Sequence, residues 1–188
     1  MKYILPILFS ITLYSCKLIY GIKENVPLSQ KEIKESANHF EIINTYSIDS
    51  SYNSFLSAIP NHRVAKDHLQ PLQALYYNKE GKIIASFINC NAGGFPNLKW
   101  NKNGNLSTFP PHPMEVEDDI SLNSLLTGCK IQVPKNNALK DYTIVIFWNM
   151  FMNRQTRIFL NSIRKNLSKA KDLSLNIIYI NNDNFISQ

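Results

Sequence analysis

The chain has 188 residues, of which 44% are hydrophobic and 18% are charged, and its formal net charge is +6. This composition predicts one globular domain with a core of ordinary size and excludes a disordered chain. Its lysines and arginines are scattered and form no basic stripe with interleaved aromatic residues, which argues against a nucleic-acid-binding protein. The modest positive charge suits a position beside an anionic membrane surface.

The N-terminus has the pattern of an export signal. Lys2 precedes an apolar run from Tyr3 to Tyr14, which is shorter than the roughly 20 residues of a transmembrane helix and matches the core of a signal peptide. The run ends in Leu13–Cys16, LYSC, which resembles the lipobox of bacterial lipoproteins. The resemblance implies that residues 1–15 are removed and that Cys16 carries a lipid anchor in the cell envelope. Because no acidic residue directly follows Cys16, we expect a periplasm-facing protein. The alternatives are a plain secretory signal and an uncleaved anchor.

Two further cysteines, Cys90 and Cys129, remain after lipidation. Outside the cytoplasm such a pair is typical of a disulfide. The bridge would close a loop of about 40 residues and stabilise the fold by on the order of 4 kcal/mol. The alternative is two buried free thiols.

The first part of the mature chain, residues 16–38, is polar and is expected to form a lipidated tether and an entry helix. Ser29 with Glu32 three residues later is the pattern of a capping box. A single domain is expected over residues 39–188. Within it, SSYNSFLSAIP predicts a short helix that stops at Pro60, and we expect His62 and His68 to be surface histidines rather than zinc ligands.

Two β-hairpins are predicted over residues 72–110. The first turns at Asn78-Lys79-Glu80-Gly81, and the second pairs Leu98–Trp100 with Leu106–Phe109 around Asn103-Gly104. The acidic run at residues 115–122 suits the start of a helix that Gly128 would end.

A βαβ unit is predicted over residues 140–184. Tyr142–Trp148 is β-branched and aromatic without alternation, as in a strand covered on both faces. An amphipathic helix follows, and Ser174–Asp183 reads as a second strand parallel to the first. The fold class is therefore α+β or α/β: N-terminal helices, two hairpins, then the βαβ unit.

This unit resembles the thioredoxin-like proteins of the bacterial envelope over residues 120–183. In that family a hydrophobic strand ending in Phe-Trp precedes a Trp and a Cys-x-x-Cys motif at the start of a long helix. Here Phe147-Trp148 is followed by Phe151, and the cysteine positions are Met152 and Gln155. The resemblance implies a thioredoxin-like fold that cannot perform dithiol exchange, since both thiols are missing. The printed sequence ends soon after the second strand, so the remaining strands of such a fold are either missing or come from the N-terminal hairpins. The alternative is a βαβ unit in an unrelated α+β domain.

Three functions are compatible with these patterns. The first is a redox-inactive lipoprotein that binds a peptide or another envelope protein around Phe151, Met152 and Gln155. The alternative for these three residues is that they only pack the start of the helix. The second is a structural or interaction lipoprotein that uses Trp100 and the loop with Gly93-Gly94 and Phe95.

The third is a thiol enzyme that uses Cys90 with Cys129. The sequence shows no catalytic constellation, so an enzyme is disfavoured, and we expect neither a cofactor nor a metal. Apart from the membrane and an envelope partner, no binding partner is indicated.

Overall fold

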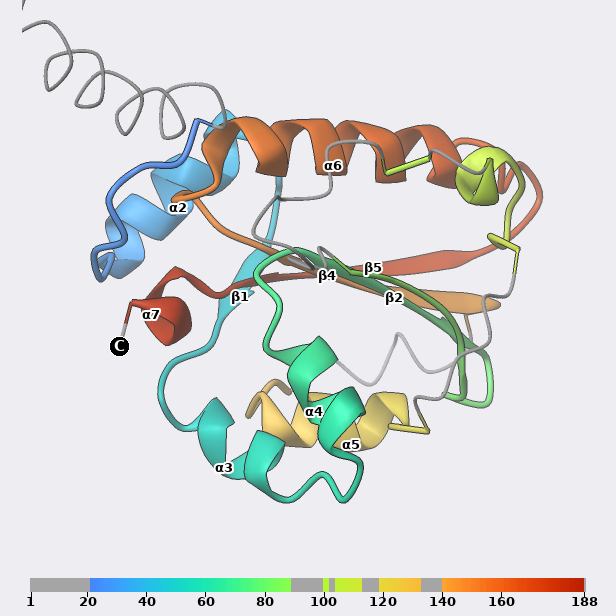
Figure 1. Ribbon diagram of the computed structural model, residues 1–188. Coiled ribbons are helices and arrows are strands. Elements are labelled where there is room, and N and C mark those ends of the chain that lie inside the picture. Colours follow the sequence, from blue (N-terminus) through green and yellow to red (C-terminus); the bar gives the residue numbers. More distant parts are fainter. Residues whose placement is uncertain (1–20, 89–99, 102–103, 113–118, 133–139, 188) are drawn as a thin grey trace, which may run out of the picture.

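The computed structural model describes residues 21–88, 100–101, 104–112, 119–132 and 140–187. These residues form a mixed five-stranded sheet with helices on both faces (Figure 1). The strands are β1 (Thr45–Ser47), β2 (Gln73–Asn78), β3 (Ile83–Ile88), β4 (Tyr142–Trp148) and β5 (Leu175–Asn181). The helices are α2 (Gln30–His39), α3 (Tyr52–Ser57), α4 (His62–His68), α5 (Leu122–Gly128), α6 (Asn153–Leu167) and α7 (Asp183–Ile186), with a 3₁₀ turn η2 (Asn105–Ser107). The mixed α+β class expected from the sequence is confirmed.

The strand order is β1-β5-β4-β2-β3. β1, β5 and β4 run parallel, whereas β2 is antiparallel to both β4 and β3. Strand β4 therefore lies at the centre of the sheet, with its parallel βαβ partner β5 on one side and the first hairpin on the other. The predicted βαβ unit is confirmed.

The position of β4 explains why apolar and polar residues do not alternate in its sequence. Ile144, Ile146 and Trp148 lie in the core on one face of the sheet, and Val145 and Phe147 lie in the core on the other. Both faces of a central strand are covered, so both sets of alternating positions must be apolar.

The two faces are covered by different parts of the chain. α6, α2 and η2 pack on one face, and α3, α4 and α5 pack on the other (Figure 1). Cys129, which follows α5, is buried in the second layer and lies on the opposite side of the sheet from α6. The sheet thus separates this thiol from the start of α6.

The first predicted hairpin is confirmed, and the second is wrong. β2 and β3 are joined by a turn in which Gly81 has a φ of 74° and donates its N–H to the carbonyl of Asn78. Among the described residues of the second segment there is no strand. Gly104 is left-handed, η2 follows it, and Leu106 packs in the core beneath α6.

The second segment is fixed by side-chain bonds rather than by strand pairing. The buried amide of Asn166, on α6, donates to the carbonyls of Leu106 and Thr108. A turn signal such as Asn-Gly fixes only the local backbone, and here the tertiary partner is a helix.

The N-terminal part of the described chain is packed onto the body. Ser29 and Glu32 form the predicted capping box of α2, and Ile33 is buried against the sheet. Just before this helix, the backbone N–H of Leu28 donates to Asn184 Oδ1, and the Asn184 amide donates back to the carbonyl of Leu28. These bonds hold the segment that leads into α2 against α7.

Two local expectations need correction. Gly128 is still helical, and its role is close packing, because a Cβ added there would lie 2.3 Å from the ring of Phe55 on α3. His68 is buried rather than exposed, and its ring meets Phe55 edge-on.

Candidate functional site

The turn between β4 and α6 occupies the place where the resemblance puts a redox site. It starts at Asn149, after β4, and Met152 is the N-cap residue of α6, although its side chain does not cap the helix. The backbone N–H groups of this turn need acceptors because a helix start has unpaired donors. They find them in side chains from elsewhere in the fold.

Asp183 supplies the main acceptor. Its carboxylate accepts the N–H of Met150 at 2.8 and 3.0 Å and the N–H of Phe151 at 3.1 Å. The amide of Asn181 donates to the same carboxylate at 2.7 Å. Asp183 is the second residue after β5, so the carboxyl ends of two parallel strands bring it to this turn. It places a carboxylate at the positive end of the α6 dipole.

Asp183 is only 2% exposed. Burial raises the pKa of its carboxyl above the ordinary value of 3.8, and the bonds from Asn181, Met150 and Phe151 act in the opposite direction. No cation is recorded beside it among the described residues. The carboxylate is therefore held by N–H donors alone.

Two asparagines complete this cluster. The Asn149 amide donates to the carbonyl of Pro71 at 2.8 Å and to Asn182 Oδ1 at 3.1 Å, and Asn182 also donates to Pro71. The carbonyl oxygen of the Asn149 side chain accepts the N–H of Met152 at 3.0 Å. These hydrogen bonds connect Pro71, just before β2, to the ends of β4 and β5. The cluster therefore stabilises the fold, and it contains no nucleophilic side chain.

The residues expected to form a binding surface here are largely closed off. Met152 is 4% and Gln155 2% exposed, so neither offers a contact surface, and Phe151 is half-buried. The segment after Gly21 lies over this end of α6, where the N–H of Lys23 donates to the carbonyl of Phe151 at 2.7 Å.

Trp100 also belongs to the interior. It is 5% exposed, and its ring centroid lies 4.3 Å from that of Phe159 on α6. Its expected role in an exposed interaction surface is therefore wrong. Phe95 and Gly93-Gly94, which were grouped with it, lie outside the described residues.

Cys129 has the properties of an inert thiol. Burial raises its pKa to about 12, whereas reactive cysteines have a lowered pKa and access to solvent. Cys90 and the lipidation residue Cys16 lie outside the described residues, so the disulfide and the anchor stay predictions.

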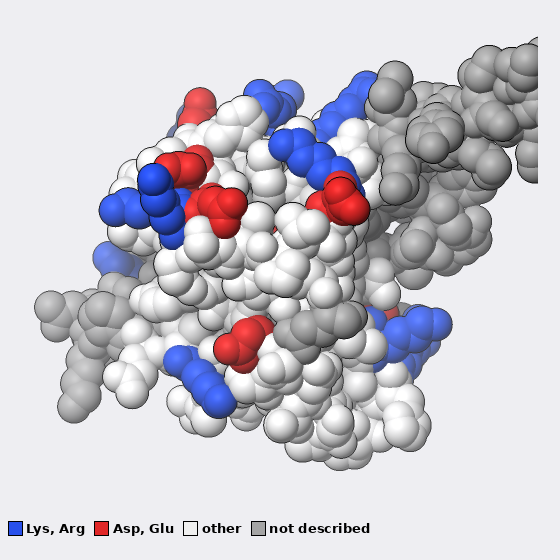
Figure 2. Space-filling view, turned by 90° about the vertical axis from the view of Figure 1, so that its left-hand side faces the viewer, with Lys and Arg blue, Asp and Glu red and all other residues white. Residues whose placement is uncertain are grey.

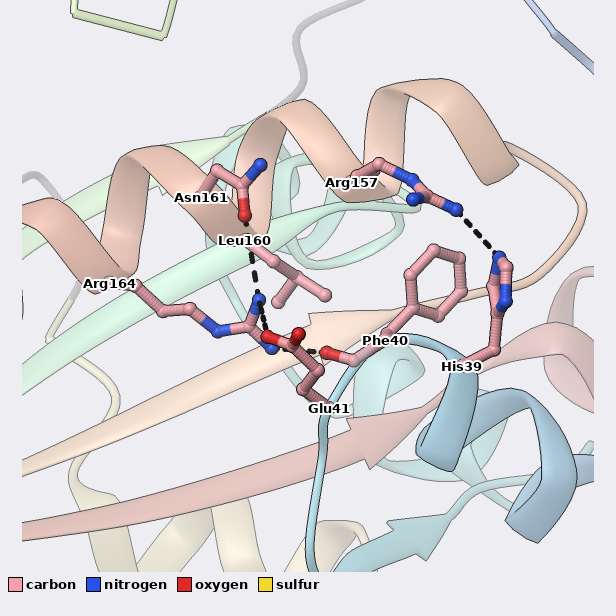
Figure 3. Close-up of a pocket in the computed structure, with 7 residues that line it drawn as sticks. All are labelled: His39, Phe40, Glu41, Arg157, Leu160, Asn161 and Arg164. Carbon is pink, nitrogen blue, oxygen red and sulfur yellow. Dashed lines mark hydrogen bonds and ion pairs between the residues drawn. The ribbon is translucent and has the colours of Figure 1, made fainter.

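A polar hollow between α2 and α6 was not anticipated from the sequence (Figure 3). Its volume is about 160 Å³. It is lined by residues of α2, the two residues that follow this helix and the outer face of α6: His39, Phe40, Glu41, Arg157, Leu160, Asn161 and Arg164. Phe40 and Leu160 are buried, whereas Arg157 and Asn161 are exposed. The hollow therefore combines an apolar floor with a polar rim.

Two arginines stand on either side of this hollow. Arg164 bonds to the carbonyl of Phe40, pairs with Glu41 at 3.3 Å and donates to Asn161 Oδ1 at 3.4 Å. Arg157 donates to His39 Nε2 at 2.7 Å. No sequence motif joins α2 to α6, because the two helices meet only in the folded chain.

No group of metal-binding side chains is found among the described residues. Within the same part of the chain, no helix has the length and apolarity to cross a bilayer. No family model, curated protein or solved structure matches the chain.

Proposed function

We propose that this chain is a lipid-anchored protein of the bacterial cell envelope, with a redox-inactive thioredoxin-like unit that serves in binding rather than catalysis. The lipobox-like sequence at Leu13–Cys16 supports the anchor and the location. The β2–β3 hairpin beside β4 supports the thioredoxin-like interpretation, because it supplies the strands that the C-terminal unit lacks.

One observation carries the non-catalytic part of the proposal. The N–H groups of Met150 and Phe151, at the turn before α6, are already bonded to the Asp183 carboxylate. A thiolate at this position would need those same donors and would face a negative charge. Together with the inert Cys129, this leaves no thiol suited to exchange among the described residues.

The test is a thiol–disulfide exchange assay, such as insulin reduction, on the wild type and on the double variant Met152→Cys/Gln155→Cys. We expect no activity in the wild type. We also expect little activity in the double variant, because both positions are buried and Asp183 raises the pKa of any nearby thiol. A wild type that catalyses exchange and loses this activity on Cys129→Ser would contradict the proposal.

A further inference from the structure

The side chains that line the hollow between α2 and α6 carry more positive than negative charge. Its lining holds the guanidinium groups of Arg157 and Arg164 and one carboxylate, Glu41. Glu41 pairs with Arg164 and is 84% exposed. One positive charge, on Arg157, therefore has no carboxylate beside it among the described residues.

Arg157 also has unused donors. A guanidinium group only donates hydrogen bonds, so His39 Nε2 must be the acceptor of their 2.7 Å contact and carries no proton in this arrangement. This contact uses one of the five N–H groups of Arg157. The others meet no hydrogen-bond acceptor in the part of the chain that the structure describes.

Asn161 adds a donor between the two arginines. Its Oδ1 accepts from Arg164, which directs its amide nitrogen away from that partner (Figure 3). The nitrogen donates to no described residue. Arg157 and Arg164 thus offer donors from two sides of the hollow, and the Asn161 amide nitrogen is a third donor at its rim.

We propose that this hollow binds a phosphate group. Arginine N–H groups match the oxygens of phosphate in geometry and charge. Donors on several sides suit a tetrahedral oxyanion better than a planar carboxylate. The apolar floor of Phe40 and Leu160 keeps water from one side of the site, which strengthens the charge-assisted bonds. In this site Arg157 and Asn161 contact the phosphate directly, and the phosphate replaces Glu41 as a partner of Arg164.

Glu41 has an unusual backbone that fits this role. Its φ is 58°, in the left-handed region that non-glycine residues seldom adopt, and it directly follows the C-cap of α2. This conformation holds its carboxylate over Arg164 without burying it. An exposed counter-ion of this kind is easily displaced by a stronger anion.

The face of the molecule around α2 and α7 does not form a broad basic patch. Basic and acidic side chains are interspersed on the end of the molecule with α2 and α7 (Figure 2). The attraction for phosphate is therefore local to the hollow and should depend on particular side chains rather than on net charge.

The phosphate could belong to a soluble phosphomonoester or to a lipid headgroup. Gly21 packs against Arg154, one turn before Arg157 on the same helix. Under the proposed lipid anchor, the chain from Cys16 to Gly21 spans at most about 17 Å, so membrane phosphates lie within reach of this side of α6. The site itself stands on the geometry of the hollow and does not depend on the anchor.

The test measures binding of two probes to the full chain in a neutral detergent or on nanodiscs. The probes are inorganic phosphate, followed by calorimetry, and nanodiscs with or without phosphatidylglycerol. Arg157→Gln should weaken binding by about 10- to 100-fold, the usual effect of losing a hydrogen bond to a charged group. Glu41→Gln should strengthen it by up to about fivefold, since it removes a competing surface carboxylate.

Lys165→Gln is the matched control, because Lys165 is exposed on α6, outside the hollow, and has the same charge as Arg157. It should leave binding nearly unchanged. If inorganic phosphate binds and the three variants change its affinity as expected, the ligand is a soluble phosphate group. If only nanodiscs with phosphatidylglycerol bind and the variants change that binding as expected, the ligand is a lipid headgroup. Equal losses for Arg157→Gln and Lys165→Gln, or no binding of either probe, would overturn the proposal.

Discussion

Replacing one carboxylate oxygen of Asp183 by a hydrogen-bond donor should destabilise the protein more than the loss of a single hydrogen bond accounts for. Both carboxylate oxygens of Asp183 are acceptors, and three N–H groups, those of Met150, Phe151 and the Asn181 amide, converge on them. Asp183→Asn replaces one oxygen by a donor. Whichever way the new amide is turned, at least one buried N–H is left facing another donor.

A buried donor without an acceptor costs about 1–3 kcal/mol. We therefore expect Asp183→Asn to lower the free energy of unfolding by about that amount, and Asp183→Ala to lower it by about 3 kcal/mol or more, because all three donors lose their acceptor. The assay is denaturant unfolding, followed by the fluorescence of Trp100 and Trp148. In Asp183→Asn, hydrogen exchange should also become faster at the amides of Met150 and Phe151 in the native state.

Asp141→Asn is the control, since Asp141 accepts from the N–H and hydroxyl of Ser174 at 2.7 and 2.8 Å but is exposed. Water replaces the lost acceptor there, so its effect should be much smaller. If Asp183→Asn is as stable as the wild type, or if both variants lose the same free energy of unfolding, Asp183 is not the required acceptor of this turn.

The raised pKa of Asp183 gives a pH dependence with a definite sign. The folded protein binds this proton more readily than the unfolded chain does. The contribution of Asp183 to stability is therefore fully present below its unfolded pKa, near 3.8, and is lost as pH rises through the folded pKa. Carbon NMR titration of the Asp183 carboxyl should show a midpoint above 3.8, and a midpoint below that value would contradict the assigned balance of burial and hydrogen bonding.

Three further predictions concern packing and the buried thiol. Gly128→Ala should lower stability by about 1–3 kcal/mol, because the added Cβ lies 2.3 Å from Phe55, and an unchanged denaturation midpoint would argue against that contact. Asn166→Ala should cost about 2–4 kcal/mol by removing the partner of the Tyr76 hydroxyl and of two backbone carbonyls, as measured by thermal unfolding. Under reducing conditions at pH 8, Cys129 should be alkylated far more slowly in the native protein than in urea, because a pKa of about 12 leaves roughly one thiol in ten thousand ionised. Equal rates, measured by mass spectrometry, would show that the thiol is accessible.

The elements with strong local signals were predictable. The unbroken apolar run of β4, the Ser29–Glu32 capping box and the Asn78–Gly81 turn each depend on residues close in sequence, and the structure has all three. The second hairpin failed because its Asn-Gly signal competes with a tertiary contact. Leu106 packs beneath α6 instead of lying in a strand.

The candidate sites were less predictable, because they join segments far apart in the chain. The run Asn181-Asn182-Asp183 at the end of a parallel strand was a usable signal, since such ends meet at one edge of the sheet. The burial of Met152 agrees with the apolar side chains that follow at helical spacing, whereas the polar Gln155 gave no sign in the sequence that it would be buried. The hollow at Arg157 could not be predicted, because no local sequence pattern indicates that α2 packs beside α6.

The most direct test of the proposed function is the intact mass of the native protein extracted from the membrane fraction, with and without reduction and alkylation. We expect a chain that begins at Cys16 and carries diacylglyceryl and acyl groups, and a Cys16→Ser variant that lacks this modification. The alkylation count in the same experiment reports whether Cys90 and Cys129 are bonded. An unlipidated chain, cleaved elsewhere or beginning at Met1, would contradict the anchor and with it the proposed place in the cell envelope.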